Sequence, residues 1–245
     1  ETLTPPSPLM DSGNCVALIS SDAERTFVSW PGAEGVLSPD LLAPVSVLPG
    51  DWVFSSGYTL SYPSSREALA DWIEALPSGV PFVFDPTPVI ADIPRSVLER
   101  VLARSTWLSC NTAEAAMIAG AGDLETVAAR LLEAYCPKAE GVVIRAGANG
   151  CVVRLASGET RAIPGFEVAA VDTNGAGDTH IGAFISALSR GVPVFEAARY
   201  ANAAAALSVT RHGGSSAPDY HDIETFLRHA GRSAPTRDRS EETPV

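Results

Sequence analysis

The sequence predicts an α/β fold in which helices cover both faces of a mostly parallel sheet. Short apolar runs alternate along the chain with segments whose apolar residues recur at helical spacing. The runs at 82–84 and 142–144 are continuously apolar, which is typical of strands buried on both faces. The chain has 245 residues, 46% of them hydrophobic, which is enough for one substantial core. Ligands of such sheets bind at the carboxyl ends of the strands.

The first half of the chain predicts a hairpin and then repeated β-α-β units. Two β-prone runs, at 15–19 and 26–30, flank a polar turn at 21–24 and indicate a small β lid over 14–30. Alternating strands and helices follow, and they imply right-handed crossovers. The predicted strands are 52–54, 82–84, 106–108 and 142–144, and the predicted helices are 69–76, 97–102, 114–119 and 124–135.

The second half predicts a further hairpin, three helices and a polar tail. Strands at 151–155 and 159–163 flank Ala156-Ser157-Gly158, which favours an antiparallel hairpin. A helix begins at the Gly-rich turn 175–177, and its apolar face carries Ile181, Phe184, Ile185 and Leu188. An Ala-rich helix at 195–209 and a last helix at 222–228 follow. We expect one domain over 1–230 and a disordered tail over 231–245.

Composition excludes several classes of protein. The net charge of −12 argues against a nucleic-acid partner. No apolar run approaches the length that crosses a membrane, and the first residues do not have the pattern of a signal peptide. The four cysteines, at 15, 110, 136 and 151, have no metal-ligand spacing. We expect them to be buried thiols in a reducing compartment, and the protein to be cytoplasmic.

The turn at 175–177 and the carboxylate of Asp178 suggest phosphate chemistry. Backbone N–H groups at a helix N-terminus lack intrahelical partners, and together with the helix dipole they bind anions. Asp178 could take a proton from a hydroxyl while these amides hold a phosphate. The alternative is a turn followed by a helix cap. The same tetrapeptide, Gly-Ala-Gly-Asp, recurs at 120–123 between two predicted helices, so its flanks must decide.

The flanking residues resemble the ribokinase (PfkB) family of carbohydrate kinases over about residues 12–228. The run Asp172–Asp178 is similar to the family signature, and Asn111-Thr112-Ala113-Glu114 to its Asn-x-x-Glu motif. The stretch 143–150 resembles its nucleotide-binding strand and loop. The stretch 201–214 resembles its adenine and cation region, and Gly32 with 24–27 its lid.

The resemblance implies a ribokinase-like three-layer α/β/α sandwich with a mostly parallel central sheet and a small β lid. It implies that Asp178 is the general base and contacts the substrate, with Gly175, Ala176 and Gly177 as the anion hole. The cofactors would be ATP, Mg²⁺ and a monovalent cation such as K⁺. The implied ATP site is Asn111, Arg145, Ala146, Gly147, Ala148, Asn149, Gly150 and Asn202. Glu114 would order Mg²⁺ through water, and the monovalent-cation set would be Asp172, Asn174, Ser208, Arg211 and Gly213.

Structural alternatives exist for four of these residues. Asn111 and Glu114 could be a helix N-cap and its capping-box partner, which is compatible with function. Asn202 could be a buried polar group bonded to a neighbouring loop. Arg145 could be a surface charge at a strand end.

The leading functional hypothesis is an ATP-dependent kinase that phosphorylates a small sugar. The alternatives are a nucleoside kinase of the same family and a non-catalytic nucleotide- or sugar-binding protein. Family lids also suggest a homodimer through the 14–30 hairpin. Members of the family normally open with strands and helices that grip the sugar. Nothing before Cys15 resembles them, so we expect the sequence to lack that N-terminal segment and the residues that select the sugar.

Overall fold

The computed structural model describes residues 6–19 and 25–232. The chain divides into two compact units. Unit 1 comprises Glu1–Gly147 and Cys151–Ala162, and unit 2 comprises Ala148–Gly150 and Ile163–Val245. Unit 1 holds the hairpin and nearly all of the large sheet, whereas unit 2 holds the three C-terminal helices.

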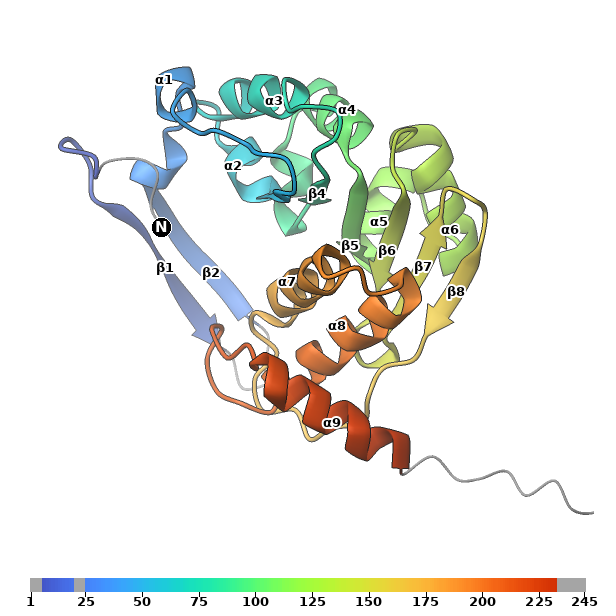
Figure 1. Ribbon diagram of the computed structural model, residues 1–245. Coiled ribbons are helices and arrows are strands. Elements are labelled where there is room, and N and C mark those ends of the chain that lie inside the picture. Colours follow the sequence, from blue (N-terminus) through green and yellow to red (C-terminus); the bar gives the residue numbers. More distant parts are fainter. Residues whose placement is uncertain (1–5, 20–24, 233–245) are drawn as a thin grey trace, which may run out of the picture. The chain divides into compact units, whose positions relative to one another are not determined.

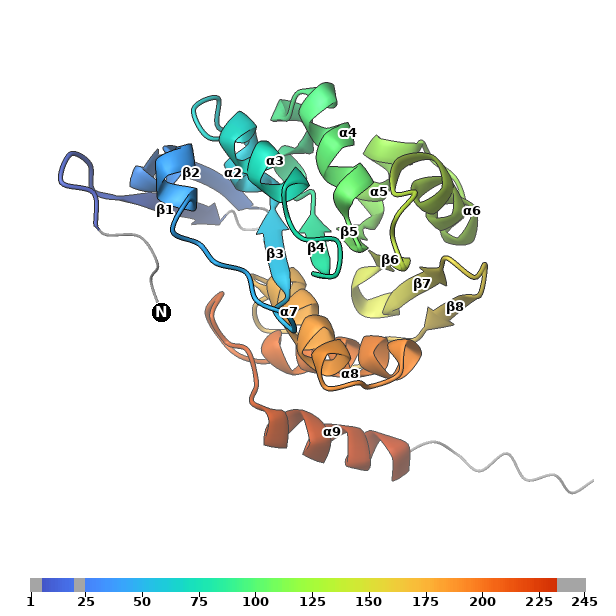
Figure 2. The same cartoon turned by 45° about the horizontal axis from the view of Figure 1, so that its top comes forward.

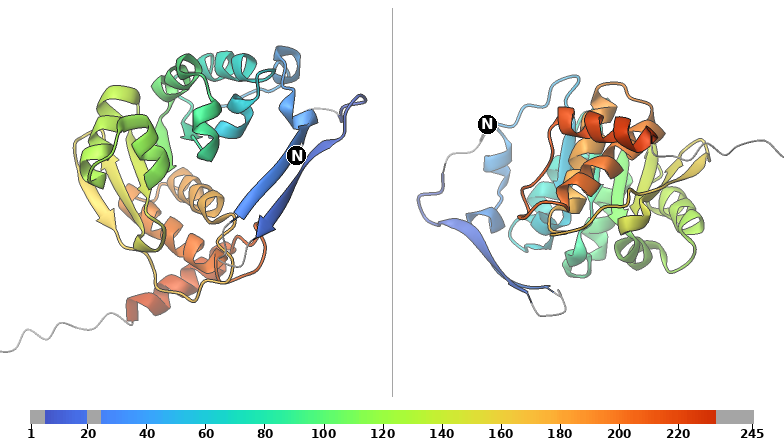
Figure 3. Two further views of the ribbon diagram at one scale, coloured as in Figure 1. Left: turned by 180° about the vertical axis from the view of Figure 1, so that it is seen from behind. Right: turned by 90° about the horizontal axis from the view of Figure 1, so that it is seen from below.

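The predicted N-terminal hairpin is confirmed. Strand β1 (Ser12–Ile19) pairs antiparallel with β2 (Arg25–Gly32), and Val16 lies opposite Val28. Figure 3 shows the pair as a separate two-stranded ribbon in blue. The predicted turn at 21–24 lies outside the described residues.

The large sheet has six strands in sequential order and is mostly parallel, as predicted (Figure 1). The first four strands are parallel, and β7 then runs antiparallel to β6. The parallel strands β3 to β6 are joined by crossover connections, and each connection places the next strand beside the previous one. The strands are β3 (Val53–Ser56), β4 (Phe82–Asp85), β5 (Trp107–Asn111), β6 (Gly141–Arg145), β7 (Cys151–Leu155) and β8 (Thr160–Ile163).

Four helices of unit 1 lie along one face of this sheet, as Figure 2 shows. They are α3 (Arg66–Glu74), α4 (Arg95–Arg104), α5 (Thr112–Ala119) and α6 (Leu124–Arg130), which continues as a π-helical turn over Leu131–Tyr135. All four were predicted, and α3, α4 and α6 were predicted from their apolar spacing. The single turns were not, because a helix of one turn has no periodicity to read. They are α1 (Pro39–Leu42), α2 (Gly57–Ser61) and the 3₁₀ turns Ala33–Gly35, Pro88–Asp92 and Gly147–Asn149.

Unit 2 is built on the packing of α7 (Ala176–Ser189) against α8 (Val194–Ser208). The buried face of α8 is mostly alanine, and small side chains let two helix backbones approach closely. Helix α9 (Tyr220–Arg232) packs on α8. Residues 231 and 232 are therefore helical, so the predicted start of the tail at 231 is wrong. The remainder of the predicted tail lies outside the described residues.

The core and the cysteines agree with the sequence in all but one respect. Strands β4, β5 and β6 are buried nearly throughout, as their apolar runs predict. Cys110, Cys136 and Cys151 are buried free thiols. Cys15 is free but exposed, so the expectation of four buried thiols is wrong there, because a two-stranded ribbon leaves its side chains open. No helix in the described part of the chain is long and apolar enough to span a membrane.

The turn after β4 is held in an unusual backbone conformation. Thr87 is buried and has a φ of 59°, which is rare for a β-branched residue and marks a strained position. Gly57, at the start of α2, lies against this turn, and a Cβ added there would stand 2.0 Å from the Pro86 carbonyl oxygen. The absence of a side chain at Gly57 therefore sets the position of the turn that follows β4.

We predict that Gly57→Ala lowers the free energy of unfolding by about 2 kcal/mol, because the methyl group must displace backbone rather than a flexible side chain. Gly79→Ala is the matched control, since nothing lies within 4 Å of a Cβ there. It should change stability by less than ~0.5 kcal/mol. Urea unfolding of both variants measures the difference. Equal stability would show that the close approach at Gly57 does not constrain the turn.

Candidate active site

Asn111 and Glu114 form a capping box at the start of α5, directly after β5. The Glu114 N–H donates to Asn111 Oδ1 (2.9 Å), and the Asn111 N–H donates to Glu114 Oε2 (2.7 Å). The Asn111 side-chain amide also donates to Glu114 Oε1 (2.7 Å). The capping-box alternative is thus what the contacts show. The same bonds fix a carboxylate that is only 3% exposed at the carboxyl end of a central strand.

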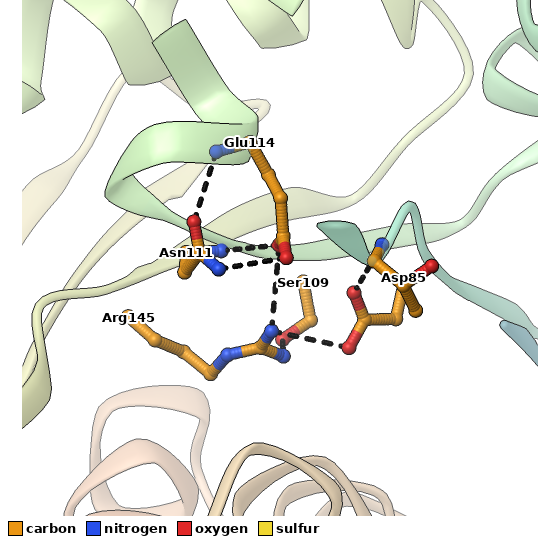
Figure 4. Close-up of polar contacts among 6 residues, drawn as sticks. Asp85, Ser109, Asn111, Glu114 and Arg145 are labelled. Atoms are coloured by element: carbon orange, nitrogen blue, oxygen red, sulfur yellow. Dashed lines mark hydrogen bonds and ion pairs between the residues drawn. The ribbon is translucent and has the colours of Figure 1, made fainter. Parts of the chain in front are cut away.

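Arg145, the last residue of β6, reaches across the strand ends (Figure 4). One guanidinium nitrogen, Nη2, lies 3.1 Å from Asp85 Oδ2 and 3.6 Å from Glu114 Oε2. The other, Nη1, donates to Ser109 Oγ (2.9 Å). The side chain is 12% exposed, so the surface-charge alternative for Arg145 is wrong. The guanidinium instead links the carboxyl ends of β4, β5 and β6.

Asp85 was not among the residues that the sequence singled out. It ends β4, its carboxylate is 6% exposed, and Oδ1 accepts the Thr87 N–H (3.0 Å). The signal available in the sequence was an acidic residue directly after a continuously apolar strand, Phe82–Phe84, where ligands of such sheets bind. The structure adds the strained Thr87, and strain of this kind concentrates at functional sites.

Burial and charge act against each other on Glu114. Its burial raises the pKa of the carboxyl group above the ordinary value, and the neighbouring Asp85 charge adds to the rise. The hydrogen bond from the Asn111 backbone and the positive charge of Arg145 oppose it. The charged forms of Asp85 and Glu114, both buried, therefore depend on the positive charge of the Arg145 guanidinium between them.

Asp85 and Glu114 have the oxygen donors that a hard divalent cation prefers. Within the described ranges, however, no group of three or more His, Cys, Asp or Glu side chains could hold a metal. Two carboxylates suit a cation such as Mg²⁺ that completes its shell with water and substrate phosphates.

In unit 2, Gly175 forms the turn that starts α7. Its φ is 74°, and a Cβ there would stand 2.1 Å from the Gly214 carbonyl oxygen, so only glycine fits. The first-turn amides of α7 lack intrahelical acceptors, and the Ala176 N–H makes only a long hydrogen bond, 3.4 Å, to the Thr173 carbonyl oxygen of the preceding turn. Asp178 follows in this first turn and is exposed. Among the described residues, its carboxylate makes no hydrogen bond or ion pair.

Asp178 lines a cavity of about 420 Å³ that lies wholly within unit 2. Gly214, Ser215, Arg190, Tyr200 and Tyr220 also line it. The Arg190 guanidinium lies over both tyrosine rings, 5.3 Å and 5.2 Å from their centroids. Asp178 and the loop that touches Gly175 therefore line the same cavity.

The residues expected to hold a monovalent cation lie in one part of unit 2. Asp172 accepts the Asn174 N–H through Oδ1 (2.9 Å) and the Gly213 N–H through Oδ2 (3.1 Å). The Ser208 carbonyl accepts the Arg211 N–H and the Ser216 hydroxyl, both at 3.1 Å. The Arg211 side chain turns to Asp222 (2.7 Å), so only its backbone could contribute to a cation site. The structure thus joins the signature turn to the 208–214 loop.

Both polar atoms of the Asn202 side-chain amide have hydrogen-bond partners inside the fold. Its Nδ2 group donates to the Ile163 and Pro164 carbonyls, both at 3.1 Å, and its Oδ1 lies 3.0 Å from His180 Nε2. The contacts match the alternative of a buried polar group that bonds a neighbouring loop. This loop touches the predicted nucleotide loop, because a Cβ at Gly150 would stand 2.1 Å from the Ile163 oxygen. Asn202 therefore positions backbone next to residues 148–150.

The predicted nucleotide loop, 146–150, follows β6 and contains a 3₁₀ turn. Gly147 and Gly150 have positive φ values, 59° and 89°. Gly147, Ala148 and Asn149 are exposed, so the loop can meet a ligand. Its turn conformation follows from the two glycines.

Comparison with known proteins identifies relatives of the chain. Residues 10–220 match the model of the pfkB family of carbohydrate kinases. The chain is 35% identical over 214 residues to an uncharacterised sugar kinase, YegV, of Escherichia coli, covering 87% of this chain and 66% of that protein. It is 31% identical over 224 residues to the ribokinase of Haemophilus influenzae, covering 89% and 70%.

Solved structures agree. The structure of ribokinase from Giardia lamblia superposes with a TM-score of 0.78 at 26% identity, covering 91% of this chain and 73% of that one. This likeness confirms the ribokinase-like α/β fold that the sequence predicted. The chain spans about two thirds of the length of the relatives that it matches.

We predict that Gly175→Ala destabilises unit 2 by about 1–3 kcal/mol, because it forces an L side chain into a positive φ and against the Gly214 carbonyl. Gly182→Ala on the same helix is the matched control, since it has open space around the added methyl. Alanine should stabilise the helix there by about 0.5–1 kcal/mol. Thermal unfolding of both variants is the measurement, and a neutral Gly175→Ala would contradict the account of this turn.

Proposed function

The chain belongs to the pfkB family of carbohydrate kinases, and from this we propose that it transfers the γ-phosphoryl group of ATP to a hydroxyl of a small sugar. The observation that carries the proposal is the turn at Gly175, which places an exposed carboxylate, Asp178, in the first turn of α7.

Asp178 is the general base in this proposal. It accepts the proton of the attacking hydroxyl as the oxygen approaches the γ-phosphorus, so that the nucleophile does not carry the proton into the new ester bond. Its exposure and its lack of a protein partner among the described residues support the role, because a base must reach the proton directly.

The amides of Gly175, Ala176 and Gly177 act as an anion hole for the transferred group. Phosphoryl transfer needs positioning and charge stabilisation more than covalent chemistry. Donors fixed by a turn that only glycine can form need no reorganisation as charge develops. A monovalent cation such as K⁺ would stabilise this turn. Its ligands would be oxygens of Asp172, Asn174, Ser208, Arg211 and Gly213.

The nucleotide is proposed to bind along the loop 146–150 with Asn111 near the phosphates. Asn202 is placed indirectly, through the loop at 163–164 that its amide holds. Glu114 would hold Mg²⁺ through water, and the cation would neutralise phosphate charge. The free cysteines support action in a reducing compartment such as the cytoplasm.

Nucleosides are the alternative acceptors, and a non-catalytic binder is the alternative class. The intact turn and carboxylate at 175–178 favour catalysis over simple binding, because a binder has no use for a base. A panel of sugars and nucleosides as acceptors distinguishes a sugar kinase from a nucleoside kinase.

We predict that Asp178→Asn lowers the rate of phosphoryl transfer by about 10²–10⁴-fold, because the amide cannot accept the hydroxyl proton. ATP affinity should stay largely unchanged, which titration calorimetry can measure. Asp123→Asn is the matched control, since Asp123 ends the identical tetrapeptide at 120–123 but caps α6 through Thr126. Equal activity of Asp178→Asn and the natural protein would remove Asp178 from its proposed role.

A second copy of this chain is the proposed partner of the β1–β2 hairpin. Val16, Leu18, Val28 and Trp30 share one face of the ribbon, because cross-strand pairs and alternate residues point the same way. Each of them is roughly half exposed, from 47% to 59%. An apolar face of this kind on a thin ribbon favours burial against an identical ribbon.

We predict that Val28→Lys turns a dimer into a monomer in sedimentation velocity, because a charge in the centre of the paired face would be desolvated without a partner. Met117→Lys is the control, since Met117 is similarly exposed (55%) but lies on α5. A monomeric natural protein, or an unchanged dimer in Val28→Lys, would contradict the pairing.

A further inference from the structure

The contacts of Arg145 point to a role beyond nucleotide contact. Its Nη2 atom lies 3.1 Å from Asp85 and 3.6 Å from Glu114, so one nitrogen faces both buried carboxylates. We propose that Arg145 is a positioning residue that occupies the space between Asp85 and Glu114 and prevents a divalent cation from binding there without nucleotide. The proposal deepens the kinase function proposed above and rests on it for the identity of the nucleotide.

The charges of the cluster support this role. Asp85 and Glu114 carry two negative charges and Arg145 carries one positive charge, so the group has a net charge of −1. A divalent cation that approached the carboxylates would meet the guanidinium at contact distance, and repulsion is strong where water is largely excluded. Arg145 therefore weakens the attraction that two buried carboxylates would otherwise exert on a free cation.

The geometry shows that the guanidinium is held in place. Ser109 Oγ accepts its Nη1–H at 2.9 Å, and the whole side chain is 12% exposed. Asp85 is fixed in turn by the Thr87 N–H, and Glu114 by the N–H and side-chain amide of Asn111. Every member of the cluster has a second anchor, so the charges keep their arrangement (Figure 4).

The consequence is selection of a metal–nucleotide complex over the free metal. A cation that arrives with nucleotide brings phosphate oxygens and water as ligands and needs little from the protein carboxylates. The guanidinium can then face the phosphate charge, for which arginine is well suited. A free cation brings no negative charge to compensate Arg145.

The test is a titration of the nucleotide-free protein with Mn²⁺. The electron paramagnetic resonance signal of free Mn²⁺ measures how much of the ion is bound. Arg145→Met should bind Mn²⁺ at least about tenfold more tightly than the natural protein, because the repulsion is removed and both carboxylates become available. Arg154→Met is the matched control on β7, since Arg154 is also partly buried and pairs with Glu133 outside the cluster. It should leave Mn²⁺ binding unchanged.

Two further measurements keep the test decisive. The double variant Asp85→Asn/Arg145→Met restores the net charge of −1 and should return Mn²⁺ affinity toward that of the natural protein. If Arg145→Met is too unstable to titrate, Mn²⁺ should raise its melting temperature more than it raises that of the natural protein.

Unchanged or weaker Mn²⁺ binding in Arg145→Met would overturn the proposal, as would a failure of millimolar Mn²⁺ to stabilise an unstable variant. None of these measurements needs turnover. A failure of the kinase proposal, tested with Asp178→Asn, is therefore distinguishable from a failure of this one.

Discussion

The ion pairs of Arg145 are the interaction on which the candidate site of unit 1 depends. Parallel strands that end together bring Asp85 and Glu114 close to one another below the surface, where two like charges could not both persist unaided. The guanidinium compensates them and ties three adjacent strand ends together. Without the guanidinium, the Asp85 and Glu114 carboxylates would repel each other in a buried place.

Unit 2 meets a different constraint, which is steric rather than electrostatic. The turn at Gly175 approaches the Gly214 carbonyl so closely that no side chain fits. Asp172 holds the same two loops together by accepting the N–H groups of Asn174 and Gly213. The donors of the proposed anion hole would then be fixed by backbone geometry, and the carboxylate of Asp178 makes no hydrogen bond or ion pair among the described residues. In the proposed reaction, the backbone amides would bind the phosphoryl group and the Asp178 side chain would accept the proton.

The sequence predicted those features that are local. Continuous apolar runs predicted β4, β5 and β6, helical spacing predicted the long helices, and the glycines of 175–177 predicted the turn before α7. The contacts of Arg145 with Asp85 and of His180 with Asn202 span 60 and 22 residues, so no periodicity reveals them. The conformation of Thr87 was not predicted either, because a positive φ goes against the local preference of a β-branched residue. Cys15 was misplaced because a two-stranded ribbon buries neither of its faces.

Acceptor-dependent ADP formation tests the central claim most directly. The protein at its natural length, supplied with ATP, Mg²⁺ and K⁺, would be offered a panel of sugars and nucleosides one at a time. We predict that at least one sugar raises ADP formation well above the rate without acceptor, together with stoichiometric sugar phosphate. ADP formation that no acceptor in the panel increases would contradict the account.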